Sequence, residues 1–216
     1  MNRIPLLFLA VAMMAATASC NDIPEGFTPV FDGKTLNGWR KFTEYNGDDG
    51  KWEVIDGAIV GQQYPKDHGA YLVTEKSYSN YEVIAVMKAD YPTDTGLFLR
   101  SQPNILSYQV TIDYRPGGEL GAIYSPGAGG FLKHNTEGEK LWKKNDWNVV
   151  RARIEGQPAH IKVWINGTET MDFQDTMVDG KYRVPASGLL CLQVHPGENN
   201  PTGDTVYFKG IYIKEL

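Results

Sequence analysis

The sequence predicts an all-β domain, a jelly-roll sandwich of two antiparallel sheets, and three observations support this prediction. Short runs of β-branched and aromatic residues recur along most of the chain, which is typical of strands. Turn-forming pairs such as Asp56-Gly57 and Asn166-Gly167 separate several of these runs, and such pairs favour two-residue hairpin turns. The sequence contains no amphipathic run long enough for a substantial helix. Many short strands joined by turns indicate a sandwich.

The first 19 residues are predicted to be a signal peptide rather than part of the sandwich. One cation, Arg3, precedes an apolar run at 4–12, and small residues then lead to Cys20. This pattern is typical of a secretory signal, and the apolar run is too short to span a membrane stably. The residues ending at Cys20 resemble the lipobox of bacterial lipoproteins, whose cysteine carries the lipid. An ordinary cleaved signal with an incidental cysteine is the alternative.

The mature chain is expected to be a lipidated tether at 20–26 followed by a single domain at 27–216. We expect an exported lipoprotein on the periplasmic or cell-surface face of a bacterial membrane, attached only through its N-terminal lipid. The net charge of −5 is mild and spread along the chain, which argues against a nucleic-acid partner. With Cys20 lipidated, Cys191 is the remaining thiol, and we expect it to pack as a small apolar residue.

The strands of the domain are expected in the following order. Residues 52–55 and 58–61 flank the Asp56-Gly57 turn and form a hairpin. Residues 81–88 form a central strand whose apolar character predicts that both of its faces are covered. Further strands are expected at 96–100, 108–114, 147–155, 160–165, 188–195 and 205–216.

Three of these strands present polar residues to one side of a sheet, because side chains alternate between the two faces of a strand. The polar side chains predicted to share this side are Arg100, Gln109, Thr111, Asp113, Gln193 and His195. Their apolar neighbours, such as Ile112, Leu190 and Leu192, are expected in the core. If the polar side is concave, these side chains converge on a cleft.

Several sequence segments, taken in order, resemble the 3-keto-disaccharide hydrolase domain family. They include FTPVFDGKTLNGW at 27–39, TGLFLR at 95–100, YQVTID at 108–113, GLLCLQVH at 188–195 and FKGIYIKEL at 208–216. Each segment is short, but the ordered set covers nearly the whole mature chain. The resemblance implies a concanavalin-like jelly roll, often lipid-anchored, that acts on glycosides oxidised at C3.

The alternation and the resemblance together select candidate site residues. The catalytic candidates are Arg100, Asp113 and His195, and the candidates for contacting the substrate are Glu75, Gln109, Tyr124, Trp142 and Gln193. Each has a structural alternative: Arg100 could be a solvated strand residue, Asp113 a turn cap, and Glu75 a surface carboxylate. Tyr124 and Trp142 could be core or rim residues instead of a platform for sugar stacking.

The chemistry implied by the family agrees with these residue types. A ketone at C3 acidifies the C2 proton, so a positioned base can remove it and the resulting enolate can expel the C1 substituent. His195 suits the base, because a histidine titrates near neutral pH. Arg100, or a divalent metal ion held by Asp113 and its neighbours, suits the developing negative charge. No cofactor is certain, and both a hydrolase and a lyase outcome stay open.

A different class of function is compatible with the same residues. The predicted sandwich could be a non-catalytic carbohydrate-binding module or a surface adhesion protein, because a fold does not determine a function. For both the enzyme and the binding module the partner is a carbohydrate, and for the enzyme this carbohydrate is a 3-keto-glycoside. Cleavage of the sugar separates the enzyme from the binding module.

The first prediction concerns the lipid anchor. Replacing Cys20 by serine removes the thiol that would carry the lipid, so the Cys20→Ser protein should move from the membrane fraction to the soluble fraction. Mass spectrometry of the N-terminal peptide should find lipid on the wild type only. Identical fractionation of the two proteins, with no lipid mass on either peptide, would show that the cysteine is incidental.

Overall fold

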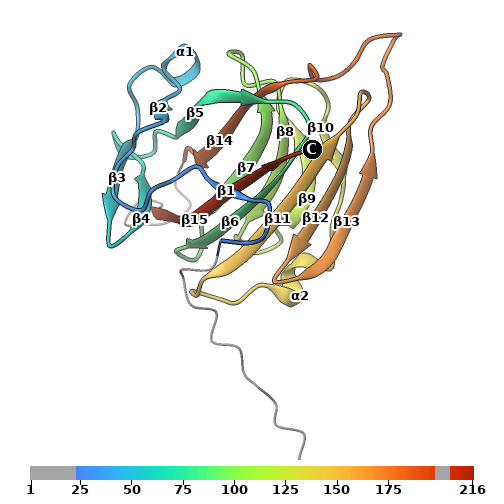
Figure 1. Ribbon diagram of the computed structural model, residues 1–216. Coiled ribbons are helices and arrows are strands. Elements are labelled where there is room, and N and C mark those ends of the chain that lie inside the picture. The colour runs from blue at the N-terminus through green and yellow to red at the C-terminus, as the bar shows by residue number, and fades with distance from the viewer. Residues whose placement is uncertain (1–22, 198–204) are drawn as a thin grey trace, which may run out of the picture.

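The computed structural model describes residues 23–197 and 205–216 (Figure 1). The signal peptide, Cys20 and the first part of the tether lie outside these residues, so the lipid anchor stays a prediction. Within the described part of the chain, no helix is long and apolar enough to cross a membrane. The domain is built almost entirely of strands, and its two helices are single turns, α1 (Thr43–Asn46) and α2 (Gly138–Leu141). The all-β prediction is therefore confirmed.

Two antiparallel sheets make up the domain. Sheet A has the order β13-β12-β11-β6-β15-β4-β3, with β1 paired to β15. Its strands are β13 (Thr168–Gln174), β12 (His160–Ile165), β11 (Asn148–Glu155), β6 (Tyr81–Ala89), β15 (Thr205–Glu215), β4 (Ala58–Gln62), β3 (Lys51–Ile55) and β1 (Thr28–Pro29). Figure 1 shows β13, β12, β11 and β6 side by side in this sheet.

Sheet B carries the site described below. Its order is β10-β9-β8-β7-β14-β5-β2. Its strands are β10 (Gly130–Lys133), β9 (Leu120–Ser125), β8 (Tyr108–Asp113), β7 (Asp94–Ser101), β14 (Gly188–Val194), β5 (Ala70–Tyr78) and β2 (Trp39–Lys41). Strands distant in sequence are neighbours here, since β14 inserts between β7 and β5. This arrangement places His195, which follows β14, beside Asp94 at the start of β7, and Asp94 in turn pairs with Asp113 at the end of β8.

The core lies between the two sheets and confirms the predicted alternation. Leu190 and Leu192 of β14 and Ile112 of β8 are fully buried in it. The central strand β6 departs from prediction on one face. Its inward residues Val83 and Met87 are fully buried. On the outward face Glu82 is buried, whereas Ile84, Val86 and Lys88 are half-buried. Sheet A therefore has one buried face and one partly solvated face, as is usual for an antiparallel sheet.

Sheet B buries residues on both of its faces. On the face turned away from sheet A, Cys191 packs in a second cluster with Tyr71, Val73, Phe98 and Ile105, together with Phe42. Cys191 is completely buried, and burial raises the pKa of its thiol well above the usual range. The thiol is therefore an unreactive packing group, as the sequence predicts. The outward cluster supports the floor of the site.

Strand β7 contains a β-bulge that overturns the predicted position of Arg100. Leu189 pairs with Ser101, and Cys191 pairs with Phe98, so β7 uses one residue more than β14 over this stretch. Arg100 takes a left-handed backbone with φ of 54°. A bulge interrupts the alternation of faces, and the Arg100 side chain consequently leaves the polar side of sheet B.

Arg100 instead lies in the protein interior and connects the two sheets. It is completely buried. Its guanidinium donates to the carbonyl oxygens of Ser79 (2.9 Å) and Gly156 (3.0 Å) and to the side-chain oxygens of Asn80 (3.1 Å) and Gln157 (3.3 Å). These acceptors belong to the β5–β6 and β11–β12 turns. The predicted placement of Arg100 in the cleft is therefore wrong, and its geometry is that of a structural residue.

The second prediction tests this structural role. Arg100→Met keeps most of the side-chain volume but removes the four part-buried hydrogen bonds of a fully buried guanidinium, so the free energy of unfolding should fall by about 3 kcal/mol. Urea unfolding should report a lower midpoint with an unchanged slope. Arg40, which is half-buried and paired with Glu44 at the surface, provides the control, because Arg40→Met should leave the midpoint nearly unchanged. An Arg100→Met protein as stable as the wild type would contradict the role.

Candidate functional site

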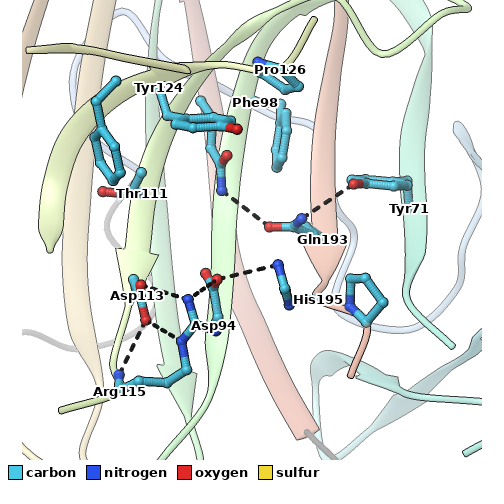
Figure 2. Close-up of a pocket in the computed structure, with 13 residues that line it drawn as sticks. Tyr71, Asp94, Phe98, Thr111, Asp113, Arg115, Tyr124, Pro126, Gln193 and His195 are labelled. Carbon is cyan, nitrogen blue, oxygen red and sulfur yellow. Dashed lines mark hydrogen bonds and ion pairs between the residues drawn. The ribbon is translucent and has the colours of Figure 1, made fainter. Parts of the chain in front are cut away.

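A pocket of about 320 Å³ opens on the face of sheet B that points away from sheet A (Figure 2). Its lining residues come from β5, β7, β8, β9, β10 and β14 and from the segments that follow β8, β9 and β14. They are Tyr71, Asp94, Phe98, Gln109, Thr111, Asp113, Arg115, Tyr124, Pro126, Phe131, Gln193, His195 and Pro196. The predicted cleft therefore exists on the predicted side of the sheet.

We group most of the lining residues into three rows, which we name by their chemistry. The charged row contains Asp94, Asp113, Arg115 and His195. The amide row contains Tyr71, Gln109, Thr111 and Gln193. The aromatic row contains Phe98, Tyr124 and Phe131 with Pro126. Figure 2 shows Asp113, Arg115 and His195 at one end of the pocket and Tyr124 and Pro126 at the other, with Gln193 between them.

The charged row is organised around Arg115. Asp94 and Asp113 are directly opposite each other on β7 and β8, and two like charges in that position repel each other. Arg115 contacts both: its Nε and Nη2 donate to the two oxygens of Asp113 at 2.7 Å, and Nη2 also reaches Asp94 Oδ2 at 2.8 Å. One guanidinium therefore compensates the repulsion between two carboxylates.

His195 completes the charged row at the end of β14. Its Nε2 lies 3.5 Å from Asp94 Oδ2. Burial lowers the pKa of the His195 imidazole from its ordinary value of 6.5, and the positive charge of Arg115 lowers this pKa further, while Asp113 acts in the opposite direction. The imidazole is consequently neutral at neutral pH and able to accept a proton.

The amide row forms a hydrogen-bonded chain across the sheet. Gln109 Nε2 donates to Gln193 Oε1 at 3.1 Å, and Gln193 Nε2 donates to the Tyr71 hydroxyl oxygen at 3.2 Å. Gly96 makes room for this chain, because a Cβ at that position would collide with the Gln109 side chain. The three side chains are fixed and polar, and such groups orient a ligand that has hydroxyl groups.

The aromatic row lies where β7, β8, β9 and β10 pair in register. Phe98 pairs with Gln109, Gln109 with Tyr124, and Tyr124 with Phe131. The rings of Tyr124 and Phe131 meet edge to face at 5.2 Å. Phe98 is completely buried, whereas Phe131 is 43% exposed. The row therefore runs from the pocket floor to its rim.

The structure brings five predicted site residues together and leaves three outside. Gln109, Asp113, Tyr124, Gln193 and His195 all line the pocket. Besides Arg100, two other predicted residues do not line it. Glu75 is exposed, with its backbone N–H bonded to the Gly38 carbonyl oxygen. Trp142 packs against the core with its ring 6.0 Å from that of Tyr114. Trp142 is a packing residue: it follows α2 and lies against the core, whereas the pocket is lined from the strands of sheet B and the segments that follow them.

Of the lining residues that the sequence reasoning did not select, three matter most for the charged and aromatic rows: Asp94, Arg115 and Phe131. The others are Tyr71, Phe98, Pro126 and Pro196. Asp94 could have been found, because it lies four residues before Phe98 and strand alternation places both on one face. Arg115 lies in the turn after β8, where alternation has no meaning, and it reaches the pocket by folding back onto Asp113. Phe131 belongs to a short edge strand preceded by glycines, and this segment carries little strand signal.

A divalent metal ion bound by Asp113 and its neighbours finds little support in the geometry. Both oxygens of Asp113 accept hydrogen bonds from Arg115. Within residues 23–197 and 205–216, no group of three or more histidine, cysteine, aspartate or glutamate side chains is arranged to hold a metal ion. The described side chains therefore do not fit a metal centre, and the chemistry below uses none.

One protein family matches nearly the whole chain, and solved structures share its fold. The model of the 3-keto-alpha-glucoside-1,2-lyase-like domain family matches residues 26–214. A "putative glycosyl hydrolase" from Parabacteroides distasonis is 24% identical, with 89% of this chain and 94% of that chain covered and a TM-score of 0.64. A carbohydrate-binding module from Bacillus subtilis is 14% identical, with 82% and 96% covered and a TM-score of 0.61. At these identities, the two structures show the fold alone. No functionally curated protein matches the chain.

The third prediction concerns the protonation of His195. An NMR titration of its imidazole should give a midpoint below 6.5, because burial and Arg115 both disfavour the charged ring. Arg115→Met should raise the midpoint by removing a positive charge, and Asp113→Asn should lower it by removing a negative one. A midpoint above 6.5 in the wild type, or no change in either variant, would show that the charged row does not act on His195.

Proposed function

The chain belongs to the 3-keto-alpha-glucoside-1,2-lyase-like domain family, and from this premise we propose that it cleaves glycosides that carry a ketone at C3. The observation that supports the proposal is the charged row. A neutral histidine, a guanidinium and two carboxylates meet in one open pocket beside hydrogen-bonding amides. Proton removal next to a ketone requires a base and a positive charge near the developing oxyanion, and the histidine and the guanidinium are groups of these two kinds.

His195 is the proposed base. Its neutral imidazole takes the proton from C2, and the C–H electron pair forms an enolate with the oxygen at C3. The enolate then re-forms the ketone and expels the C1 substituent, with breakage of the C1–O bond, and the departing oxygen takes up the proton that His195 removed from C2, which returns the imidazole to its neutral form. The product has a double bond between C1 and C2. A lyase releases this product, and a hydrolase adds water across the double bond.

Arg115 takes the role that the sequence assigned to Arg100. The negative charge of the enolate develops on the C3 oxygen, and a fixed positive charge near this oxygen stabilises the transition state more than the ground state. Asp113 and Asp94 hold the guanidinium in position through three hydrogen bonds of 2.7 to 2.8 Å. Asp94 also lies beside His195, where its negative charge favours the imidazolium that forms when the proton is taken.

A glycosidase that works through two carboxylates is a poorer explanation of the same pocket. Such an enzyme needs one carboxylic acid to protonate the leaving group and one carboxylate on the opposite side of the scissile bond. Here Asp94 and Asp113 are both ion-paired to Arg115 and lie on neighbouring strands. A non-catalytic sugar-binding module is the second candidate, favoured by the fixed amide row, and it predicts binding without cleavage.

The fourth prediction tests the proposed cleavage. The purified domain should cleave a 3-keto-glucoside and leave the parent glucoside intact, because the C2 proton of the parent is far too weakly acidic. His195→Ala should lower kcat by about 10²–10⁴-fold, and Arg115→Met by about 10²–10³-fold. Activity of the wild type should fall as the pH drops through the His195 pKa, because the imidazolium is not a base.

Matched controls come from the outer face of sheet A. His160 and Arg151 lie there in the ion pairs His160–Asp172 and Arg151–Glu82, so His160→Ala and Arg151→Met should leave kcat unchanged. Rapid cleavage of the unoxidised glucoside would refute elimination. Binding of the 3-keto-glucoside without any cleavage would identify a binding module.

A further inference from the structure

The aromatic row has no task in the proton transfer, yet it occupies one whole end of the pocket. It lies four residues along β7 from the charged row, from Asp94 to Phe98. At about 3.3 Å per residue, this separation is about 13 Å. The distance exceeds the width of one sugar ring, so a monosaccharide held at the charged row leaves the aromatic row unoccupied.

The proposed chemistry determines which part of the substrate reaches the aromatic row. C1 and C3 are the two ring carbons bonded to C2, so their substituents point in different directions from it. If the C3 oxygen faces Arg115 and the C2 proton faces His195, the C1 substituent points away from Arg115. Figure 2 shows that the pocket continues in that direction, past Gln193 toward Tyr124 and Pro126. The leaving group therefore occupies the aromatic end.

The surface at this end suits a flat apolar ring better than a second sugar. A sugar needs several directed hydrogen bonds, and the one amide in register with this end, Gln109, already donates to Gln193. The residues that line this end are Phe98, Tyr124, Pro126 and Phe131, which present rings and one hydroxyl. Aromatic rings attract other aromatic rings in stacked or edge-to-face arrangements.

Phe131 is the exposed member of the row and is held in place before a ligand binds. Its ring meets the Tyr124 ring in an edge-to-face arrangement, with the centroids 5.2 Å apart. It also stacks on the His134 ring, with the centroids 4.9 Å apart and an interplanar angle of 21°. His134 is itself paired with Glu119 at 2.6 Å. A large apolar side chain that is fixed and yet 43% exposed is a surface available to a ligand.

We propose that Phe131 and Tyr124 form a leaving-group subsite for an aromatic aglycone, so that aryl glycosides are the preferred substrate class. The inference rests on the proposed function for the orientation of the sugar. The recognition of an aryl ring by Phe131 does not depend on catalysis, and the two statements can be tested separately.

Two measurements test the subsite. The first compares kcat/KM for a 4-nitrophenyl 3-keto-glucoside and for a 3-keto-disaccharide. Phe131→Ala should lower the aryl value by about two- to tenfold and change the disaccharide value by less than twofold. Taking the ratio of variant to wild type on each substrate cancels the different intrinsic reactivity of the two leaving groups. Phe131→Trp should restore the aryl value.

The second measurement is calorimetric binding of unoxidised 4-nitrophenyl glucoside and methyl glucoside. Phe131→Ala should weaken aryl binding by the same two- to tenfold factor and leave methyl glucoside binding unchanged. Tyr64→Ala is the matched control, because Tyr64 is a 64% exposed aromatic residue outside the pocket lining, and it should alter neither substrate nor ligand.

The outcomes separate the two proposals. Equal losses on the aryl and disaccharide substrates, or aryl binding that is insensitive to Phe131→Ala, would overturn the aryl subsite while the cleavage reaction stands. Aryl-selective binding that depends on Phe131, in a protein that cleaves neither keto substrate, would support the subsite and overturn the proposed reaction.

Discussion

Sheet B buries residues on both of its faces, and this constraint determines where the pocket residues on its strands can lie. Along β14 the inward residues Leu190 and Leu192 belong to the main core, and the outward residues Cys191 and Gln193 lie under and in the pocket. Burial of each large apolar side chain contributes about 1.5–3 kcal/mol, so the core sets the register of the strand. A slip by one residue would place Gln193 in the core and a leucine in the pocket. The packing of the core therefore also positions the site.

The bulge in β7 is a place where sheet B breaks this rule near the site, and the break has a structural consequence. It turns Arg100 inward, where four oxygens accept its hydrogen bonds: two from the β5–β6 turn, which joins sheet B to sheet A, and two from the β11–β12 turn of sheet A. A buried guanidinium is tolerated only when its donors are satisfied, and here these two turns supply the acceptors. The same side chain thus holds the ends of the sandwich together and is removed from the pocket. Arg115, outside the regular strand, supplies the positive charge there instead.

The two ends of the pocket complement each other chemically. At the charged row, the mutual repulsion of Asp94 and Asp113 is balanced by Arg115, while burial keeps His195 neutral. At the aromatic row, rings replace charges. The amide row between them is a fixed hydrogen-bonded chain in which burial raises the pKa of the Tyr71 phenol, so that this group stays a neutral donor. A substrate with a polar reacting ring and an apolar leaving group fits this gradient, which connects the proposed chemistry to the proposed specificity.

The sequence by itself determined the fold class, the side of sheet B that carries polar residues, and the presence there of Gln109, Asp113, Gln193 and His195. It could do so because alternation along a strand is a local property, set by the two-residue period of the backbone. Arg100, Arg115 and Phe131 needed the tertiary structure. The bulge at Arg100 exists only in the pairing of β7 with β14, and Arg115 reaches the pocket through a turn held by Asp113. Phe131 acquires its place from the pairing of a short edge strand with β9. Each of these positions depends on contacts between segments whose relative placement no local pattern specifies.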